Sequence, residues 1–376
     1  MTHFSQEGDG RRLTDSRNIL VTGGAGYIGS HSCKALAEAG LVPIVYDNLS
    51  SGHEWAVRWG PLEKGDILDQ ARLDEVFKTY RPSAVIHFAA HAYVGESVEQ
   101  PAKYYRNNVV GSLNLLEVMG DYGVRKIVFS STCATYGVPQ RVPIPDDHPQ
   151  NPINPYGASK LMIERMLADY GAAYGMHSVS LRYFNAAGAD PDSEIGEDHD
   201  PETHLIPLVL EVAAGERPHI TLYGTDYDTP DGTCIRDYIH VTDLAQAHVL
   251  ALKALQEGRG VSSYNLGMGR GFSVHEVVRT AHAVTGRSIA VRDGSRRPGD
   301  PSRLVADSLR AKRELGWTPQ YGKLEPVIAT AWNWILKHRI RAPERRNLKK
   351  NIFLVARFAC RTLAEASTIS LEEQIA

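Results

Sequence analysis

The chain has 376 residues, which is enough for two domains that share a large buried core. Its apolar content of 43% and charged content of 23% are those of an ordinary globular protein. The net charge of -3 argues against nucleic-acid binding, because it provides no positive field for phosphates. Residues 1–17 are polar and expected to be disordered, and no apolar run approaches the roughly 18 residues of a membrane span.

The four cysteines are scattered along the chain, at Cys33, Cys133, Cys234 and Cys360. They form no Cys-x-x-Cys pair and have no local pattern of histidine partners. We therefore expect reduced thiols in a cytoplasmic protein, with neither a disulfide framework nor a metal site.

A glycine-rich turn follows the first predicted strand. Residues 18–22 form a short apolar run suited to a buried parallel strand, and an amphipathic helical stretch ends near Gly40. Between them, Gly23, Gly26 and Gly29 have the spacing Gly-x-x-Gly-x-x-Gly. Glycines there let the backbone approach a pyrophosphate, whose charge the helix N-terminus favours. A simple tight turn is the alternative, but strand, turn and helix together predict dinucleotide binding.

The second predicted strand, residues 42–46, leads into Asp47. This acid lies eighteen residues after Gly29, close to the distance of about 20 expected for a carboxylate that binds ribose hydroxyls. The residues that follow, Asn48, Leu49 and Ser50, include no arginine to accommodate a 2′-phosphate. The sequence therefore favours NAD over NADP.

Further alternation of strands and helices continues to about residue 188. It predicts an α/β fold, a doubly wound parallel sheet of the Rossmann type over residues 18–188. In such sheets ligands bind beyond the carboxyl ends of the strands. The expected strands are 62–65, 84–90, 126–131 and 178–183, and one expected helix, 107–119, has Val110, Leu113, Leu116 and Met119 on one face.

Tyr156 and Lys160 lie one helical turn apart at the start of an amphipathic stretch that begins at Pro155. Residues i and i+4 share a helix face, so the ammonium should lie beside the phenol. A nearby cation lowers the pKa of a tyrosine from its ordinary value of about 10, which lets the phenolate act as a base. Because such pairs are common on solvated helices, only the surrounding residues make a catalytic role the better interpretation.

Residues 189–340 predict a smaller α+β domain that covers the substrate, with segments returning to the Rossmann domain. Its expected elements are 205–215, 220–223, 241–255, 263–266 and 274–284. The basic tail, residues 341–376, is interpreted as a solvated or docked segment, and the alternative is a surface for a membrane or a partner.

An ordered series of motifs resembles the extended short-chain dehydrogenase/reductases. The series comprises residues 22–29, 47–49, 65–67, 87–90, 130–132, Tyr156 with Lys160, and 182–185. Two longer stretches, 94–108 and 236–267, are similar to those of the UDP-glucose 4-epimerase family. The resemblance covers about residues 18–335.

The resemblance implies an isomerase that interconverts UDP-glucose and UDP-galactose through a 4-keto sugar, with tightly bound NAD that is recycled. Tyr156 would be the base, Lys160 would lower its pKa, and Thr132 would orient the proton. A homodimer through the helices of Asn107 and Tyr156 is also implied. The implied NAD contacts are Gly23, Gly26, Tyr27, Ile28, Gly29, Asp47, Asn48, Asp66, Ile67, Phe88, Ala89, Asn107 and Tyr183. The implied UDP-sugar contacts are Thr132, Asn185, Leu205, Tyr223, Arg236, Arg297 and Asp300.

Three positions depart from the pattern of some family members. Ala92 stands where some have a lysine near the nicotinamide, and His204 stands where an asparagine is familiar. Leu304 falls at the position thought to gate the 2-substituent of the sugar, where its size is intermediate. UDP-pentoses and UDP-N-acetylhexosamines therefore remain alternative substrates.

Two rival functions are less consistent with the residues. A nucleotide-sugar 4,6-dehydratase typically has Asp-Glu directly after the catalytic threonine, whereas Thr132 is followed by Cys133 and Ala134. A non-catalytic NAD-binding regulator would be expected to have lost part of the triad, but Thr132, Tyr156 and Lys160 are all present.

Overall fold

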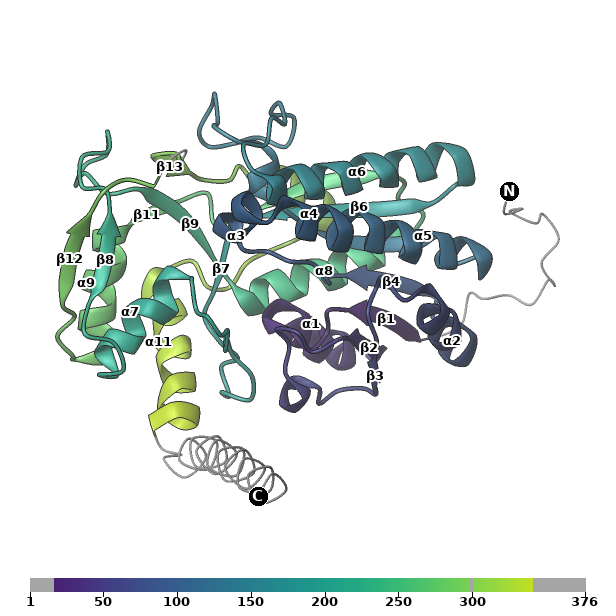
Figure 1. Cartoon of the computed structure of the whole chain (residues 1–376), viewed down its shortest axis with the longest axis horizontal. Coiled ribbons are helices and arrows are strands. Elements are labelled where there is room, and N and C mark those ends of the chain that lie inside the picture. Colours follow the sequence, from purple (N-terminus) through teal and green to yellow (C-terminus); the bar gives the residue numbers. More distant parts are fainter. Residues whose placement is uncertain (1–16, 298–299, 341–376) are drawn as a thin grey trace, which may run out of the picture.

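A computed structural model describes residues 17–297 and 300–340 of the chain (Figure 1). The predictions of a disordered N-terminus and of a basic tail over 341–376 concern segments that lie outside the described residues, apart from Arg17.

Seven parallel strands form the larger sheet, in the order β10-β6-β5-β4-β1-β2-β3. The order runs outward in both directions from β1 and β4, as a doubly wound sheet requires. This confirms the predicted fold class. The strands are β1 (Asn18–Thr22), β2 (Val42–Asp47), β3 (Leu62–Lys64), β4 (Ala84–His87), β5 (Lys126–Thr132), β6 (His177–Tyr183) and β10 (Ser262–Leu266).

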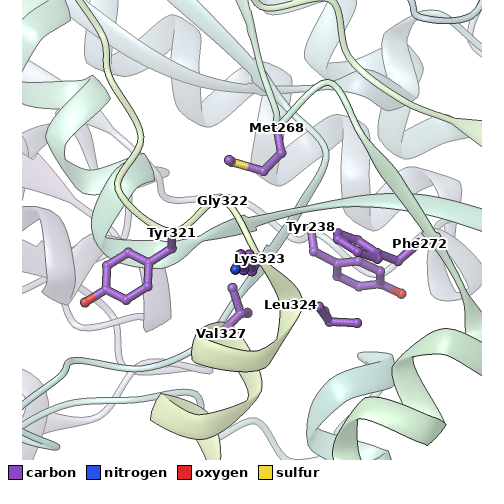
Figure 2. Close-up of a pocket in the computed structure, with 8 residues that line it drawn as sticks. All are labelled: Tyr238, Met268, Phe272, Tyr321, Gly322, Lys323, Leu324 and Val327. Carbon is purple, nitrogen blue, oxygen red and sulfur yellow. The ribbon is translucent and has the colours of Figure 1, made fainter.

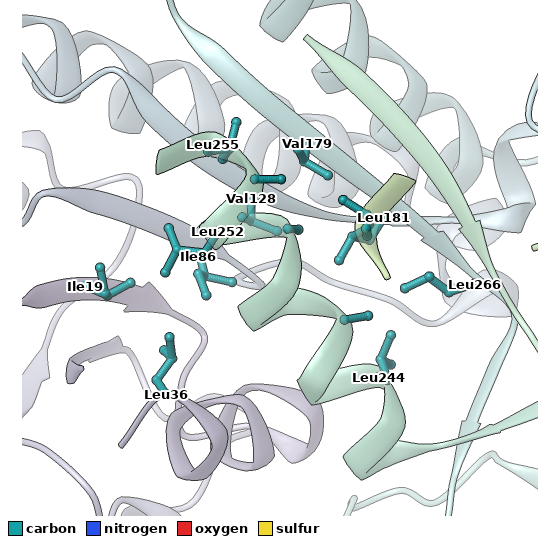
Figure 3. Packing of buried hydrophobic residues seen from close by; sticks show 14 of the residues in the cluster. Ile19, Leu36, Ile86, Val128, Val179, Leu181, Leu244, Leu252, Leu255 and Leu266 are labelled. Atoms are coloured by element: carbon teal, nitrogen blue, oxygen red, sulfur yellow. The ribbon is translucent and has the colours of Figure 1, made fainter. Parts of the chain in front are cut away.

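Helices cover both faces of this sheet (Figure 1). On one face, α1 (Tyr27–Glu38), α8 (Val241–Gln256) and α10 (Leu309–Leu315) bury an aliphatic core that includes Ile19, Ile86, Leu36 and Leu252 (Figure 3). Burying each such side chain contributes about 1.5–3 kcal/mol. On the other face, α2 (Gln70–Tyr80), α5 (Gly111–Asp121) and α6 (Pro155–Tyr174) bury Phe77, Leu115 and Leu167.

Two segments expected among the elements of the smaller domain belong to the larger sheet. Strand β10 pairs in parallel with β6 at the sheet edge, and α8 packs against α1 and the strands. Leu244, Leu252 and Leu255 of α8 are fully buried there, because this helix packs beside α1 and against β5 and β6. The predicted domain division, with its boundary at residue 188 and its segments returning to the Rossmann domain, stays a prediction.

The smaller part of the molecule contains short strands and three main helices. Strands β7 (Asn185–Ala187), β9 (Ile235–His240), β11 (Gly271–Ser273) and β13 (Arg303–Leu304) form one sheet, and β8 (Ile220–Tyr223) pairs with β12 (Val291–Gly294). Helices α7 (Leu205–Ala213), α9 (Val274–Thr285) and α11 (Leu324–Ile335) share a second core, and the π-helical turn η5 (Leu336–Ile340) follows α11.

A narrow pocket lies between this core and the β9–β11 pair (Figure 2). None of the residues predicted to bind substrate lines it, so we do not assign it to the candidate active site. Its lining residues are Tyr238, Met268, Phe272, Tyr321, Gly322, Lys323, Leu324 and Val327.

The expected helix over residues 107–119 is longer and less buried than its pattern suggested. The chain runs through α3 (Val94–Glu99), α4 (Pro101–Tyr104) and the π-helical η3 (Tyr105–Val110) directly into α5. Leu116 and Met119 are buried, but Val110 and Leu113 are 46% and 36% exposed. Of the four apolar residues expected on one helix face, Leu116 and Met119 therefore contribute to the core and the other two do not.

Within the described residues, the structure contains no helix that is long and apolar enough to cross a membrane.

Candidate active site

The glycine turn joins β1 to α1 and is packed tightly against neighbouring backbone. A Cβ atom at Gly23, whose φ is +72°, would lie 2.6 Å from the backbone nitrogen of Ala89. A Cβ at Gly29 would lie 2.2 Å from the carbonyl oxygen of Gly23. At Gly26, the N-cap of α1, the nearest atom would be 3.4 Å away. The fold itself thus requires the first and third glycines. The second leaves the helix N-terminus open to a close ligand, which fits a pyrophosphate.

Asp47, at the end of β2, holds the glycine turn in place. Its Oδ2 accepts a hydrogen bond from the backbone N–H of Ala25 at 2.9 Å, and its Oδ1 accepts one from Leu49 at 2.8 Å. Burial raises the pKa of this carboxyl, and the two backbone hydrogen bonds oppose that shift. A carboxylate has further lone pairs, so these bonds are compatible with accepting ribose hydroxyls as well.

The other residues predicted to contact NAD border the same edge of the sheet or support it. Phe88 and Ala89 follow β4, and their N–H groups donate to the carbonyl oxygen of Thr22. Asn48 donates from Nδ2 to Asp66 Oδ2 at 2.9 Å, which joins the ends of β2 and β3. Ile28, Ile67 and Asn107 are partly or fully buried, Tyr27 donates its hydroxyl to Gly188 O at 2.6 Å, and Tyr183 pairs with Ser130 Oγ at 2.5 Å.

Helix α6 begins in a way that presents Tyr156 on its first turn. Asn154 caps the helix by accepting a hydrogen bond from the Gly157 N–H at 2.8 Å, and Pro155 occupies the first helical position. Burial raises the pKa of Tyr156, and the nearby Tyr183 raises it further. A hydrogen bond with Thr132, at the end of β5, acts in the opposite direction. Thr132 and Tyr156 therefore lie close to each other, and the roles that the resemblance implied for them stay predictions.

Lys160 is buried one turn further along α6. Its Nζ donates a 2.8 Å hydrogen bond to the carbonyl oxygen of Ser130 and lies 6.0 Å from the centre of the Tyr156 ring. Burial lowers the pKa of Lys160 to about 7, although the charge of Glu164 opposes the shift. The same burial that surrounds the phenol also disfavours the ammonium in the protein alone, and the expected effect of Lys160 on the pKa of Tyr156 stays a prediction.

A buried ion pair that the sequence analysis missed holds α6 on the sheet. Arg182 of β6 donates to Glu164 of α6 at 2.6 Å, and both side chains are only 8% exposed. Ser131 of β5 and Gln150 also donate to the Glu164 carboxylate, at 2.5 and 3.0 Å. The available signal was the position of Glu164, one helical turn beyond Lys160 on the same face. This network fixes the helix that carries both Tyr156 and Lys160.

The residues predicted to bind the nucleotide sugar form two adjoining pairs. Arg236 and Asp300 make an ion pair, and the Arg297 guanidinium lies 4.2 Å from the centre of the Tyr223 ring. The two pairs are joined because the Asp300 N–H donates to the Arg297 carbonyl at 3.2 Å. The structure therefore brings together four residues from two stretches of the sequence, 223–236 and 297–300.

Two further predicted substrate residues lie in β7 and α7. Asn185 donates from Nδ2 to the carbonyl oxygen of Asp237 at 3.1 Å, and Leu205 is the first residue of α7. Leu304 pairs in register with Arg236 and packs in a cluster with Cys133, the neighbour of Thr132. Leu304, the residue expected to limit the size of the sugar 2-substituent, therefore lies beside residues expected to act on the sugar.

Comparisons with known proteins agree with this geometry. The model of the NAD dependent epimerase/dehydratase family matches residues 19–267. The chain belongs to the NAD dependent epimerase/dehydratase family. Within this family it is 54% identical over 319 residues to the UDP-glucose 4-epimerase of Rhizobium meliloti, a match that spans 85% of this chain and 97% of that protein. The resemblance to UDP-glucose 4-epimerases is thereby confirmed.

Solved structures of such epimerases share the fold over nearly their whole length. The UDP-glucose 4-epimerase from Brucella ovis in complex with NAD superposes with a TM-score of 0.82 at 58% identity, over 84% of this chain and 97% of that one. The enzyme from Bifidobacterium longum in complex with NAD+ and UDP gives a TM-score of 0.81 at 40% identity, over 85% and 98%.

Proposed function

We propose that this chain interconverts UDP-glucose and UDP-galactose with NAD as a resident cofactor. The observation that carries the proposal is the meeting of Tyr156 and Thr132 at the carboxyl edge of a Rossmann sheet. The glycine turn and Asp47 border that edge. Relatives that contain NAD and UDP support the assignment of the cofactor and of the nucleotide.

The proposed mechanism assigns a proton-handling role to each member of the triad. Bound NAD supplies reversible hydride transfer, so a sugar alcohol is oxidised and reduced again with no net redox change. Tyr156, as phenolate, takes the proton of the sugar 4-hydroxyl and returns it after the 4-keto sugar has turned over. Thr132 orients that proton through its hydrogen bond with Tyr156. Lys160 donates a hydrogen bond to the carbonyl oxygen of Ser130, which holds its side chain near the first turn of α6, where Tyr156 lies.

Binding of the nucleotide sugar is assigned to the two residue pairs of the smaller part. The guanidinium groups of Arg236 and Arg297 match the geometry of diphosphate oxygens. Asp300 offers acceptors for ribose hydroxyls, and Tyr223, at 45% exposed, offers a ring face for the uracil. Because Asp300 already neutralises Arg236, we expect that pair to open or to share Arg236 with the diphosphate when substrate binds.

The function is tested by an equilibrium assay on a panel of UDP-sugars with protein purified without added cofactor. We expect the protein to retain NAD and to convert UDP-galactose to UDP-glucose. UDP-N-acetylhexosamines and UDP-pentoses in the same panel test the alternative substrates that Leu304 leaves open. Protein that carries a full complement of NAD but converts none of these sugars would contradict the proposal.

A homodimer through α5 and α6 is the proposed assembly. Large apolar side chains remain exposed on these helices and on the adjoining α3 and η3, namely Val98 at 63%, Val110 at 46%, Leu113 at 36% and Met162 at 44%. Such a patch on helices that cover a core is typical of an interface. A second copy of the same face would cover it, because a two-fold dimer is self-complementary.

The dimer is tested by light scattering coupled to size exclusion. We expect the wild-type chain to show twice its mass of 41.4 kDa. Introducing charge into the patch with Leu113→Glu and Met162→Glu together should yield a monomer. Leu309→Glu, on α10 across the sheet and at a residue that is 70% exposed, is the matched control and should stay dimeric. A monomeric wild-type chain would exclude this assembly.

A cytoplasmic location is proposed on the chemistry of the thiols. Among the described residues Cys33, Cys133 and Cys234 are free, and the first two are buried. Unpaired cysteines are typical of proteins in a reducing compartment.

A further inference from the structure

Four side chains converge in the connection between β7 and α7, outside the candidate active site. Glu197, His199 and Glu202 lie in this connection, and His204 is the N-cap residue of α7. One ligand atom from each lies within 4.8 Å of all the others. Their sequence pattern, Glu-x-His-x-x-Glu-x-His, places four donors within eight residues.

The distances between the donor atoms suit a small tetrahedral cation. The Nδ1 atoms of His199 and His204 lie 3.2 and 2.7 Å from Glu197 Oε1. They lie 3.8 and 3.4 Å from the carboxylate oxygens of Glu202. Zinc bonds of about 2.0–2.2 Å to nitrogen and oxygen place tetrahedral ligands roughly 3.3–3.6 Å apart. An ion at the centre would have to lengthen the 2.7 Å contact by about 0.6 Å or more, and would have to draw in any donor pair that is as far apart as 4.8 Å.

The two carboxylates are buried, and a cation between them would offset their negative charge. The side chains of Glu197 and Glu202 are only 6% and 3% exposed. Glu197 Oε1, Glu202 Oε2 and His199 Nδ1 are buried, and the contacts among these four residues are their only partners within the described residues. Within residues 17–297 and 300–340, the ion pairs of the two glutamates are with these two histidines. Buried charge without compensation is strongly destabilising, so a divalent ion at the centre would offset both carboxylates.

Protons on the imidazoles are the rival to a metal ion. Burial by itself lowers the pKa of His199, but hydrogen bonds and charges from Glu197 and Glu202 outweigh burial and raise it to about 9. Burial also lowers the pKa of His204, but the charges and hydrogen bonds of the same two glutamates outweigh it and raise the pKa to about 10. A cluster held only by protons would bind no stoichiometric metal, which makes metal content the deciding measurement.

We propose that Glu197, His199, Glu202 and His204 form a structural zinc site. Two imidazoles and two carboxylates suit zinc better than magnesium or calcium, which prefer oxygen ligands alone. Four protein donors complete a tetrahedron and leave no position for a reacting molecule, which is the mark of a structural site. The His204 side chain is half-exposed, so a metal ion can reach the cluster from solvent.

The zinc site would join the two sides of the proposed active site. The ring centres of Tyr27, from the glycine turn, and His199 lie 6.2 Å apart in a T-shaped arrangement, and those of Tyr93 and His199 lie 6.3 Å apart. His204 directly precedes Leu205, a proposed substrate contact. A small recess lined by Gly26, Tyr27, Asp198 and His199 separates the cluster from the turn. The ion would thus hold the start of α7, with Leu205, near the glycine turn that is expected to bind NAD. The proposal does not rest on the proposed function, because metal content is measured directly.

The test uses full-length protein without a histidine tag, equilibrated with excess zinc chloride and then desalted. We expect mass spectrometry of the metals to find one zinc per chain in the wild type. Zinc affinity in His199→Gln and in Glu202→Gln should fall about tenfold or more, since even outer partners of metal ligands change affinity by about 10- to 100-fold. His282→Gln, at an exposed histidine near the end of α9, is the matched control and should keep wild-type zinc.

A second measurement on the wild type keeps the test decisive if a variant fails to fold. Cobalt in place of zinc should give the visible absorption of a tetrahedral site, and added zinc should abolish it. Zinc content below about a tenth of an equivalent in the wild type would overturn the proposal. So would a folded His199→Gln variant that retains as much zinc as the wild type.

Discussion

Tyr156→Phe is expected to lower the conversion of UDP-galactose by about a thousand-fold, within the range that a lost general base produces. The variant keeps the ring that packs at the start of α6 and removes only the hydroxyl that meets Thr132. NAD content should stay at the wild-type level, because the proposed contacts of the dinucleotide lie mainly on the glycine turn and on Asp47. Turnover of UDP-galactose and absorbance of released cofactor measure the two quantities separately.

The matched control for this variant is Tyr174→Phe. Tyr174 is the last residue of the same helix and is 40% exposed, so its hydroxyl is far along α6 from the proposed chemistry. We expect wild-type turnover from it. A Tyr156→Phe protein that retains most of its activity would show that another group removes the proton.

Glu164→Gln is expected to reduce the free energy of unfolding by about 3 kcal/mol, because it leaves the buried Arg182 guanidinium without its counter-charge. Glutamine keeps the size of the side chain and one oxygen acceptor, so the change isolates the charge. Urea titrations followed by fluorescence measure the loss of stability. Since Glu164 fixes α6 to β5 and β6, turnover should also fall as Tyr156 loses its fixed position.

The matched control for Glu164→Gln is Glu75→Gln. Glu75 also pairs with an arginine, Arg72, but its side chain is 67% exposed. An exposed ion pair contributes about 0–1 kcal/mol, so the control should be nearly neutral. If Glu164→Gln were as stable as the control, the buried pair would not be what holds α6 in place.

The burial around Tyr156 has a consequence for the proposed mechanism. Residues of the chain raise the pKa of Tyr156 and lower that of Lys160, so the phenol is neutral in the protein alone at neutral pH. The positive charge that favours the phenolate must then come with the bound cofactor or with a protonated Lys160. This links base formation to cofactor binding, which is an advantage for an enzyme that should not react without it.

Much of the first half of the fold follows directly from local sequence patterns. The apolar runs before Gly23 and Asp47 predict buried parallel strands, and the spacing of Gly23, Gly26 and Gly29 predicts the turn between them. These predictions succeed because each depends on residues that are neighbours in the chain. The pairing of Thr132 with Tyr156 was expected from the family resemblance, and the structure brings the two side chains into contact. The roles assigned to individual site residues stay predictions.

The packing of the second half is harder to predict from local sequence patterns, because its segments pack against elements that are distant in the sequence. An amphipathic helix such as α8 has the same period whether it packs on the large sheet or on the smaller core. Exposure of Val110 and Leu113 likewise depends on what lies opposite the helix, which periodicity does not specify.

The sequence by itself determined the class of fold, the dinucleotide turn, the acid at the end of β2 and the order of the family motifs. Each motif consists of residues that are close together along the chain. The tertiary structure alone decided that Lys160 points to the Ser130 carbonyl and that Glu164 meets Arg182. It also decided that two glutamates and two histidines turn their donor atoms toward one point. Side-chain direction and burial set these contacts, and both arise only when distant elements pack together.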